Sequence, residues 1–163
     1  MSSSLFDRSI VFKKIENSFK MYHQIKKEYE CVLNERKFDY KTGGSNGNAL
    51  ISDKTANEAI REIEPPYIPK IYIDIYNDKG NVFVRKIKDP LKWMQLYEWA
   101  KENASKNKIQ NIVFLGRYIK GESHTVTTIK NNISTQLYFD ARSEILHTAL
   151  AGACQLGIIK IML

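Results

Sequence analysis

Apolar side chains near the beginning of the chain recur at steps of three and four residues. This spacing places them on one face of a single amphipathic helix, predicted from about Ser9 to Lys37. The positions are Phe12, Ile15, Phe19, Tyr22, Ile25, Tyr29 and Val32. Such a helix would be about 40 Å long, which is more than a small protein needs to cover its own core. The apolar face is therefore either core or, in part, a seam for a partner.

Strict alternation replaces the helical spacing further along the chain. Isoleucines at every second position lead into the turn sequence Asn77–Gly80, and a second apolar run begins at Val82. The pattern predicts a β-hairpin over Ile68–Ile87. The isoleucines are Ile71, Ile73 and Ile75, and the hairpin also contains the aromatic residues Tyr72, Tyr76 and Phe83. We interpret the aromatic residues as cross-strand packing, with stacking on single-stranded bases as the alternative.

Polar segments suggest how the chain is divided. The glycine-rich stretch Lys41–Asn48 predicts a loop, and the residues 52–64 predict a short helix. A second polar stretch, 102–108, predicts a linker. We therefore expect an N-terminal helical region with the hairpin over 1–101, which serves dimerisation or partner binding. A second domain is expected over 109–163.

The last third of the chain has the pattern of three helices. The first is predicted over about Gln110–Ile119 and ends at Gly121, and the second over about Thr125–Lys130. A polar turn at Asn131–Asn132 and a cap at Ser134 lead into a long third helix. The apolar positions expected to face inward include Val126, Ile129 and Leu137. The predicted fold class is mainly α with one β-hairpin and a C-terminal helix-turn-helix.

In a helix-turn-helix, the third helix places its N-terminal turns in the major groove of DNA. The residues predicted to point outward there are Thr135, Gln136, Phe139, Asp140 and Ser143. Glutamine can hydrogen-bond an adenine bidentately, and threonine or phenylalanine can contact a thymine methyl. The flanking basic residues predicted to hold phosphates are Arg117, Lys120, Lys130 and Arg142. An ordinary three-helix packing unit with a basic surface is the alternative.

The segment RYIKGESHTVTTIKNNISTQLYFDARSEIL resembles the last helix-turn-helix of sigma factors and of sigma-like phage regulators. The shared features are an aromatic residue, a glycine, a short helix, an aliphatic–serine turn and a recognition helix. They correspond here to Tyr118, Gly121, Thr125–Lys130, Ile133-Ser134 and the residues from Thr135 onward. The upstream part, with its long helix, glycine-rich loop and the phrase ISDKTANEAI, resembles phage late transcriptional regulators of the ArpU/RinA/LtrC group. This resemblance implies a sigma region 4-like domain in an activator of phage late genes, located in the cytoplasm of a bacterial host cell.

Double-stranded DNA is therefore the expected partner of the C-terminal domain. We expect the N-terminal region to form a homodimer or to contact RNA polymerase. Two alternatives stay open at this point. One is a small terminase subunit-like protein that marks phage DNA for packaging. The other is a protein-interaction adaptor that binds no DNA.

Composition argues against other functions. The 163 residues have a net charge of +7 and 26% charged residues, which is a globular composition that favours an anionic partner. The sequence contains no phosphate-binding glycine loop, no nucleophile-elbow motif and no HExxH. Its histidines and cysteines lie at no metal-ligand spacing, and no apolar run is long enough to span a membrane. We therefore expect no enzyme activity, no cofactor and no metal.

Overall fold

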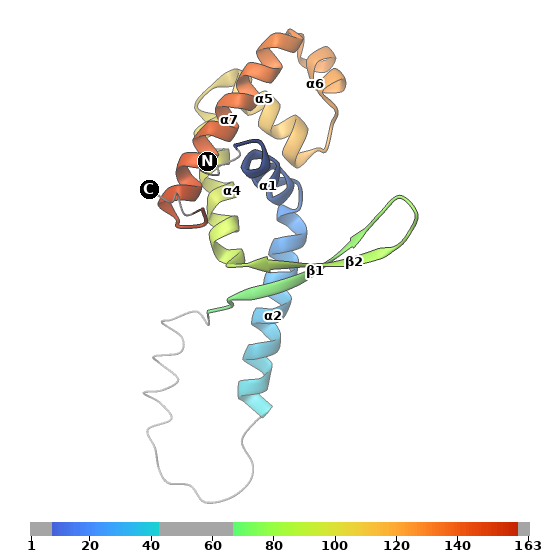
Figure 1. Cartoon of the computed structure of the whole chain (residues 1–163), viewed down its shortest axis with the longest axis vertical. Coiled ribbons are helices and arrows are strands. Elements are labelled where there is room, and N and C mark those ends of the chain that lie inside the picture. Colours follow the sequence, from blue (N-terminus) through green and yellow to red (C-terminus); the bar gives the residue numbers. More distant parts are fainter. Residues whose placement is uncertain (1–7, 43–66, 160–163) are drawn as a thin grey trace, which may run out of the picture. The chain divides into compact units, whose positions relative to one another are not determined.

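The computed structural model describes residues 8–42 and 67–159 (Figure 1). Over these residues the structure is mostly helical with one antiparallel hairpin, which confirms the predicted mainly α class with a β-hairpin. The helices are α1 (Arg8–Lys20), α2 (Tyr22–Thr42), α4 (Pro90–Ser105), α5 (Lys108–Phe114), the π-helix η1 (Leu115–Ile119), α6 (His124–Asn131) and α7 (Thr135–Gln155). The strands are β1 (Lys70–Tyr76) and β2 (Val82–Lys88). The helix predicted at 52–64, and the loop predicted at 41–48 beyond Thr42, lie outside the described residues.

Contacts divide the chain into two compact units. The first unit comprises Met1–Gln24 and Leu91–Leu163, and the second comprises Ile25–Pro90. This division differs from the predicted linker at 102–108. Helix α4 continues to Ser105, only two residues separate it from α5, and Asn107 caps α5 by accepting hydrogen bonds from two backbone N–H groups. The first unit also includes α1, because α1 packs against α7 and η1.

The predicted N-terminal helix is two helices, since regular helix is interrupted at Met21. Its apolar face is nevertheless correctly predicted. Five of the seven positions are buried by the chain itself, and the other two, Phe12 and Val32, are half-buried. The buried positions are Ile15, Phe19, Tyr22, Ile25 and Tyr29. The structure therefore uses this face as core.

An aromatic cluster forms the centre of the first unit. The Phe19 ring lies 5.6 Å from the Tyr97 ring, 5.9 Å from Phe114 and 5.4 Å from Tyr118, measured between centroids. The Tyr22 ring stacks on Tyr97 at 3.8 Å. Aromatic pairs of this kind add about 0.5–1.5 kcal/mol each beyond the area they bury. This cluster fixes α1 to α4, α5 and η1.

In the second unit, the hairpin has the predicted alternation and turn. Its register pairs Lys70 with Lys88 at one end and Tyr76 with Val82 at the other. Ile71, Ile73 and Ile87 are buried on one face. The Asn77 side chain accepts hydrogen bonds from the backbone N–H groups of Lys79 and Asn81, which holds the turn closed.

The C-terminal helices begin and end where local chemistry predicts. Ser123 caps α6, and Ser134 caps α7 with its hydroxyl accepting from the Leu137 N–H at 3.1 Å. Gly121 has a positive φ of 67°, as expected of a residue that ends a helix. Helix α5 packs along α7 (Figure 1). That these helices form a DNA-binding helix-turn-helix stays a prediction.

The orientation predicted for α6 is wrong. Val126 and Ile129 are 39% and 75% exposed, and Leu137 at the beginning of α7 is 48% exposed. Thr127 and Thr128 are buried instead. The reason is the close approach of η1. A Cβ placed on Gly116 would lie 2.6 Å from the Thr127 Oγ1, so this contact admits only a short side chain facing a glycine. Both hydroxyls donate to backbone carbonyl oxygens of α6 or its cap residue, which removes the cost of their burial.

Candidate nucleic-acid interface

The five predicted base-reading residues lie together on the first half of α7 and are all exposed. They are Thr135, Gln136, Phe139, Asp140 and Ser143. The opposite face of α7 packs into the unit, since its residues Tyr138, Ala141 and Ile145 are buried. The N-terminal half of α7 therefore presents side chains to solvent from a packed helix.

Two contacts order these side chains. The Gln136 Nε2 donates to the Asp140 Oδ1 at 2.8 Å, one turn further along the helix. The Phe139 ring lies 5.4 Å from the His124 ring of α6. The Gln136 amide keeps its carbonyl oxygen and one N–H for a ligand, which is the acceptor and donor pair that an adenine edge requires.

The two arginines predicted to hold phosphates are bound within the protein. The Arg117 Nε donates to the Glu16 Oε1 at 2.7 Å, and the Arg142 Nε and Nη2 donate to both Glu16 oxygens at 2.7 and 2.8 Å. The Tyr118 hydroxyl donates to the same carboxylate at 3.0 Å. Glu16 lies on α1 and is only 6% exposed. This group of four residues, the Glu16 cluster, joins α1 to η1 and α7.

Within the Glu16 cluster, the glutamate and the two arginines stabilise one another in their charged forms. Burial alone would raise the pKa of Glu16, but the hydrogen bonds and charges of Arg142 and Arg117 lower it to about 2. Burial likewise works against the charge on Arg117, and the hydrogen bond to Glu16 raises its pKa above the usual range. Burial and the neighbouring carboxylate raise the pKa of Tyr118. The tyrosine therefore stays a hydrogen-bond donor at neutral pH.

Glu16 was not among the predicted site residues, although a signal is present in the sequence. It lies directly after Ile15 and three residues before Phe19, and all three are buried on α1. A carboxylate at that position requires a cationic partner, because an unpaired buried charge is costly. The sequence does not show which of the chain's cations supplies it.

Acid should weaken the first unit through this carboxylate. A group whose pKa is lowered by folding stabilises the protein above its unfolded pKa, here 4.5, and loses that effect as the pH falls through about 2. We expect the free energy of unfolding to decrease as the pH falls over this window. The fluorescence of Trp93 and Trp99 measures the unfolding. The variant Glu16→Gln should lose part of this dependence. An identical pH profile for the variant and the wild type would contradict the assignment.

The two lysines predicted to hold phosphates, Lys120 and Lys130, are both exposed. The Lys130 Nζ lies 2.5 Å from the Glu122 Oε1, and this hydrogen bond lowers the pKa of the glutamate. Lys120 is also exposed and acts on Glu122 through its charge. The Lys130 side chain is 60% exposed, whereas that of Glu122 is 14% exposed, so the ammonium group stays accessible to a phosphate while it is paired with Glu122.

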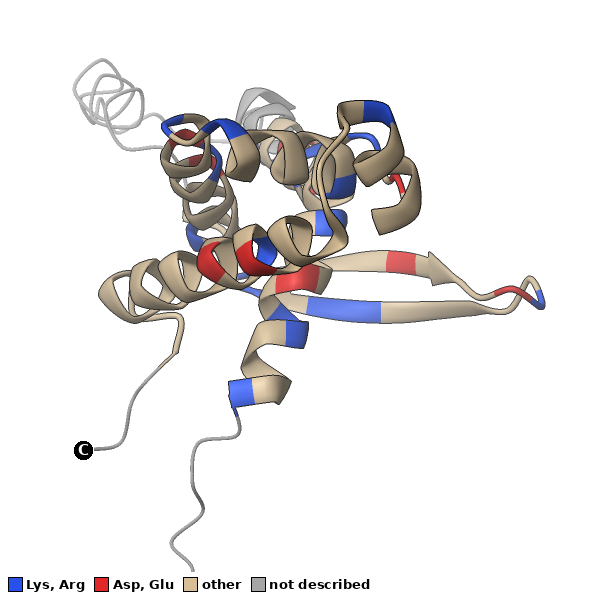
Figure 2. Ribbon diagram, turned by 90° about the horizontal axis from the view of Figure 1, so that it is seen from above, with Lys and Arg blue, Asp and Glu red and all other residues tan. Residues whose placement is uncertain are grey.

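The charge of the chain is concentrated in the first unit. Residues 1–24 and 91–163 contain six of the seven net positive charges. Acidic side chains are nevertheless present on the exposed face of α7, where Asp140 and Glu144 lie near Arg142. Figure 2 shows both acidic and basic segments on the helix that leads to the C-terminus. Positive charge therefore lies around α7 more than on it.

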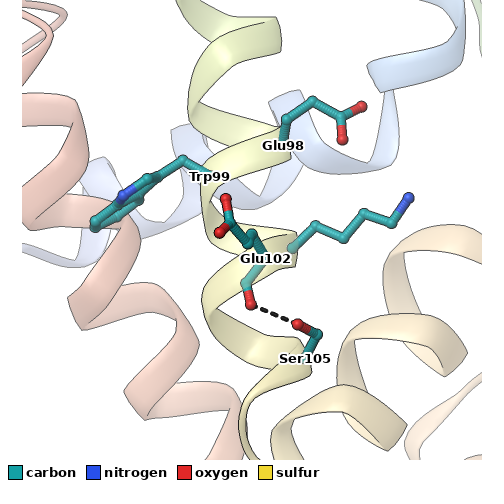
Figure 3. Close-up of a pocket in the computed structure, with 5 residues that line it drawn as sticks. Glu98, Trp99, Glu102 and Ser105 are labelled. Atoms are coloured by element: carbon teal, nitrogen blue, oxygen red, sulfur yellow. Dashed lines mark hydrogen bonds between the residues drawn. The ribbon is translucent and has the colours of Figure 1, made fainter.

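A pocket of about 410 Å³ lies on α4 in the same unit. Its lining includes Glu98, Trp99, Glu102 and Ser105, and Figure 3 shows the Glu98 and Trp99 side chains pointing in different directions. The Ser105 hydroxyl donates to the Glu102 carbonyl oxygen. The labelled side chains therefore do not converge on a common point.

Two further findings concern residues 8–42 and 67–159 of the chain. In that part of the chain, no group of histidine, cysteine, aspartate and glutamate side chains is arranged to hold a metal ion. None of its helices is both long and apolar enough to cross a membrane. Comparison of the chain with known protein families, with curated proteins and with solved structures found no match.

Proposed function

We propose that the chain is a sequence-specific DNA-binding transcriptional regulator that reads the major groove with the N-terminal half of α7. The observation that carries this proposal is the exposed polar face of that helix, presented from a packed core and directly preceded by the Ser134 cap. In keeping with the resemblance stated above, it would activate phage late genes in the cytoplasm of a bacterial host cell. Acting as a homodimer, it would require half-sites about 34 Å apart.

The structure changes the roles of the basic residues within this proposal. Arg117 and Arg142 neutralise Glu16, so we assign them to fixing α7 on α1 rather than to holding phosphates. Lys120 and Lys130 keep the phosphate role. Gln136 has the primary base-reading role, with Thr135 and Phe139 beside it for thymine methyl groups.

Gln136→Ala should lower sequence discrimination. Loss of a bidentate contact costs about 1–3 kcal/mol at the base that it reads. The measurement is the affinity for a selected duplex relative to a scrambled duplex, by fluorescence anisotropy. The matched control is Gln155→Ala at the exposed far end of α7, which should leave this ratio unchanged.

Lys130→Ala provides a contrasting variant in the same assay. It should weaken binding to both duplexes alike and reduce the slope of log affinity against log salt by about 0.9. Should both variants behave like the wild type on both duplexes, the assigned roles would be wrong.

One observation favours a second candidate, a protein-interaction adaptor. The exposed aliphatic side chains Val126 and Ile129 lie three residues apart and therefore on one face of α6. Such a face suits an apolar protein partner better than DNA. The adaptor predicts no salt-dependent binding to duplex DNA at low ionic strength, whereas the regulator predicts strong binding there.

A further inference from the structure

We propose that the outward face of the hairpin, in the second unit, binds single-stranded nucleic acid. Paired residues of an antiparallel ladder share a face, and so do alternate residues along each strand. The register therefore places Lys70, Tyr72, Lys86 and Lys88 on one face, and all four are exposed. The same face also has the exposed residues Asp74, Val82 and Val84 nearer the turn. Ile71 and Ile87 are buried on the opposite face. We call the four exposed residues, together with Tyr76 on the same face, the basic–aromatic face.

The net charge of this face favours an anion, because it has three lysines against the single carboxylate of Asp74. Lys70 lies directly opposite Lys88, and like charges in that position destabilise a strand pair. Lys86 adds a third cation opposite Tyr72. The basic stretch of β2 is visible as a blue segment in Figure 2. A phosphate chain along this face would relieve the repulsion that folding creates.

The aromatic rings indicate which kind of anion fits. Tyr72 is 50% exposed and Tyr76 is 69% exposed, four residues further along the same strand. Their backbone positions are about 13 Å apart at 3.3 Å per residue. The Lys70 Nζ lies 6.0 Å from the centroid of the Tyr72 ring, so one ring already adjoins a cation. Rings that adjoin cations offer stacking surfaces beside phosphate contacts, which is the combination that binds single strands.

A duplex fits these rings less well, because its bases are already stacked on one another and offer no free ring face. An unpaired strand offers both its base faces and its phosphates. The inference concerns the second unit alone and does not depend on duplex reading by α7.

The test uses the full chain and fluorescently labelled single strands, (dT)20 and (U)20, in anisotropy titrations. Tyr72→Ala should lower affinity by about 5- to 100-fold, since one stacked base is lost. Tyr72→Phe keeps the ring and should stay within about twofold of the wild type. Affinity for (dT)20 that exceeds affinity for (U)20 would indicate DNA, and the reverse would indicate RNA.

A charge variant tests the phosphate contacts independently of the ring. Changing Lys70, Lys86 and Lys88 together to glutamine should reduce the salt slope for single strands by about 2, at about 0.7 per phosphate. The control makes the same change in net charge on α1, at the exposed residues Lys13, Lys14 and Lys20, and should leave the slope as it is.

Three results would overturn the proposal. The first is single-strand binding that is unchanged by Tyr72→Ala and by the triple lysine variant. The second is an equal loss in Tyr72→Phe and Tyr72→Ala, which would exclude stacking. The third is a change of oligomeric state in Tyr72→Ala with single-strand binding intact, which would make this face a protein contact. Gln136→Ala should not alter single-strand binding, so failure of duplex reading and failure of this proposal give different results.

Discussion

Glu16→Gln should destabilise the first unit by about 3 kcal/mol. Removal of one partner from a buried ion pair typically costs 3–5 kcal/mol, because the remaining charge is left without a partner. Here two guanidinium groups, of Arg117 and Arg142, lose their shared carboxylate. The cost should fall at the lower end of that range because both arginine side chains are partly exposed.

Urea unfolding followed by tryptophan fluorescence measures this effect directly. The chain has two tryptophans, Trp93 and Trp99, and both lie on α4 of the first unit. Glu102→Gln is the matched control, since Glu102 is exposed on α4 and its change should stay within about 0.5 kcal/mol. A loss below about 1 kcal/mol for Glu16→Gln would show that the ion pairs are not the link between α1 and α7.

Phe19→Ala should destabilise the same unit by about 3–5 kcal/mol. The Phe19 side chain is 1% exposed and contacts aromatic rings of α4, α5 and η1, so its removal leaves a cavity at the centre of the core. The same urea titration measures the loss.

Phe139→Ala is the control for this substitution. It removes the same side chain from an exposed position on α7, and we expect a change below about 1 kcal/mol. Equal effects of the two substitutions would contradict the placement of α1 in the core of the first unit.

The correct predictions concern features that depend only on residues close together in the chain. The Ser134 cap, the Gly121 helix end and the Asn77–Gly80 turn follow from local backbone chemistry, and the structure has all three. Alternation and helical spacing also predicted the buried faces of β1 and of the first helix. These patterns require no knowledge of the rest of the chain.

The features that the sequence did not predict depend on contacts between residues far apart in the chain. Arg117 and Arg142 lie 101 and 126 residues from Glu16, and no local pattern indicates their pairing. The inward face of α6 depends on how closely η1 approaches at Gly116, which reverses the choice that hydrophobicity alone would make. The linker at 102–108 was likewise predicted from local polar composition alone. In the structure, α4 continues through this stretch to Ser105, and Asn107 caps α5.

The proposed DNA-binding site has fewer residues in the structure than the sequence predicted. Two of the four predicted phosphate contacts, Arg117 and Arg142, are instead paired with Glu16. In the proposed function, DNA binding would therefore depend on α7 with Lys120 and Lys130. Such a site has fewer phosphate contacts than predicted, so its non-specific binding should be weak at physiological salt. Specificity would depend on the bases read by Gln136 and its neighbours.

Selection of binding sites from a library of randomised duplexes tests the central claim most directly. The full-length wild-type protein and the Gln136→Ala variant are each taken through several rounds at low salt, and the bound DNA is sequenced. The account predicts one enriched motif for the wild type and a loss of preference at one base pair of that motif for the variant. A library that stays random with the wild-type protein, or a motif that is identical for both proteins, would contradict it.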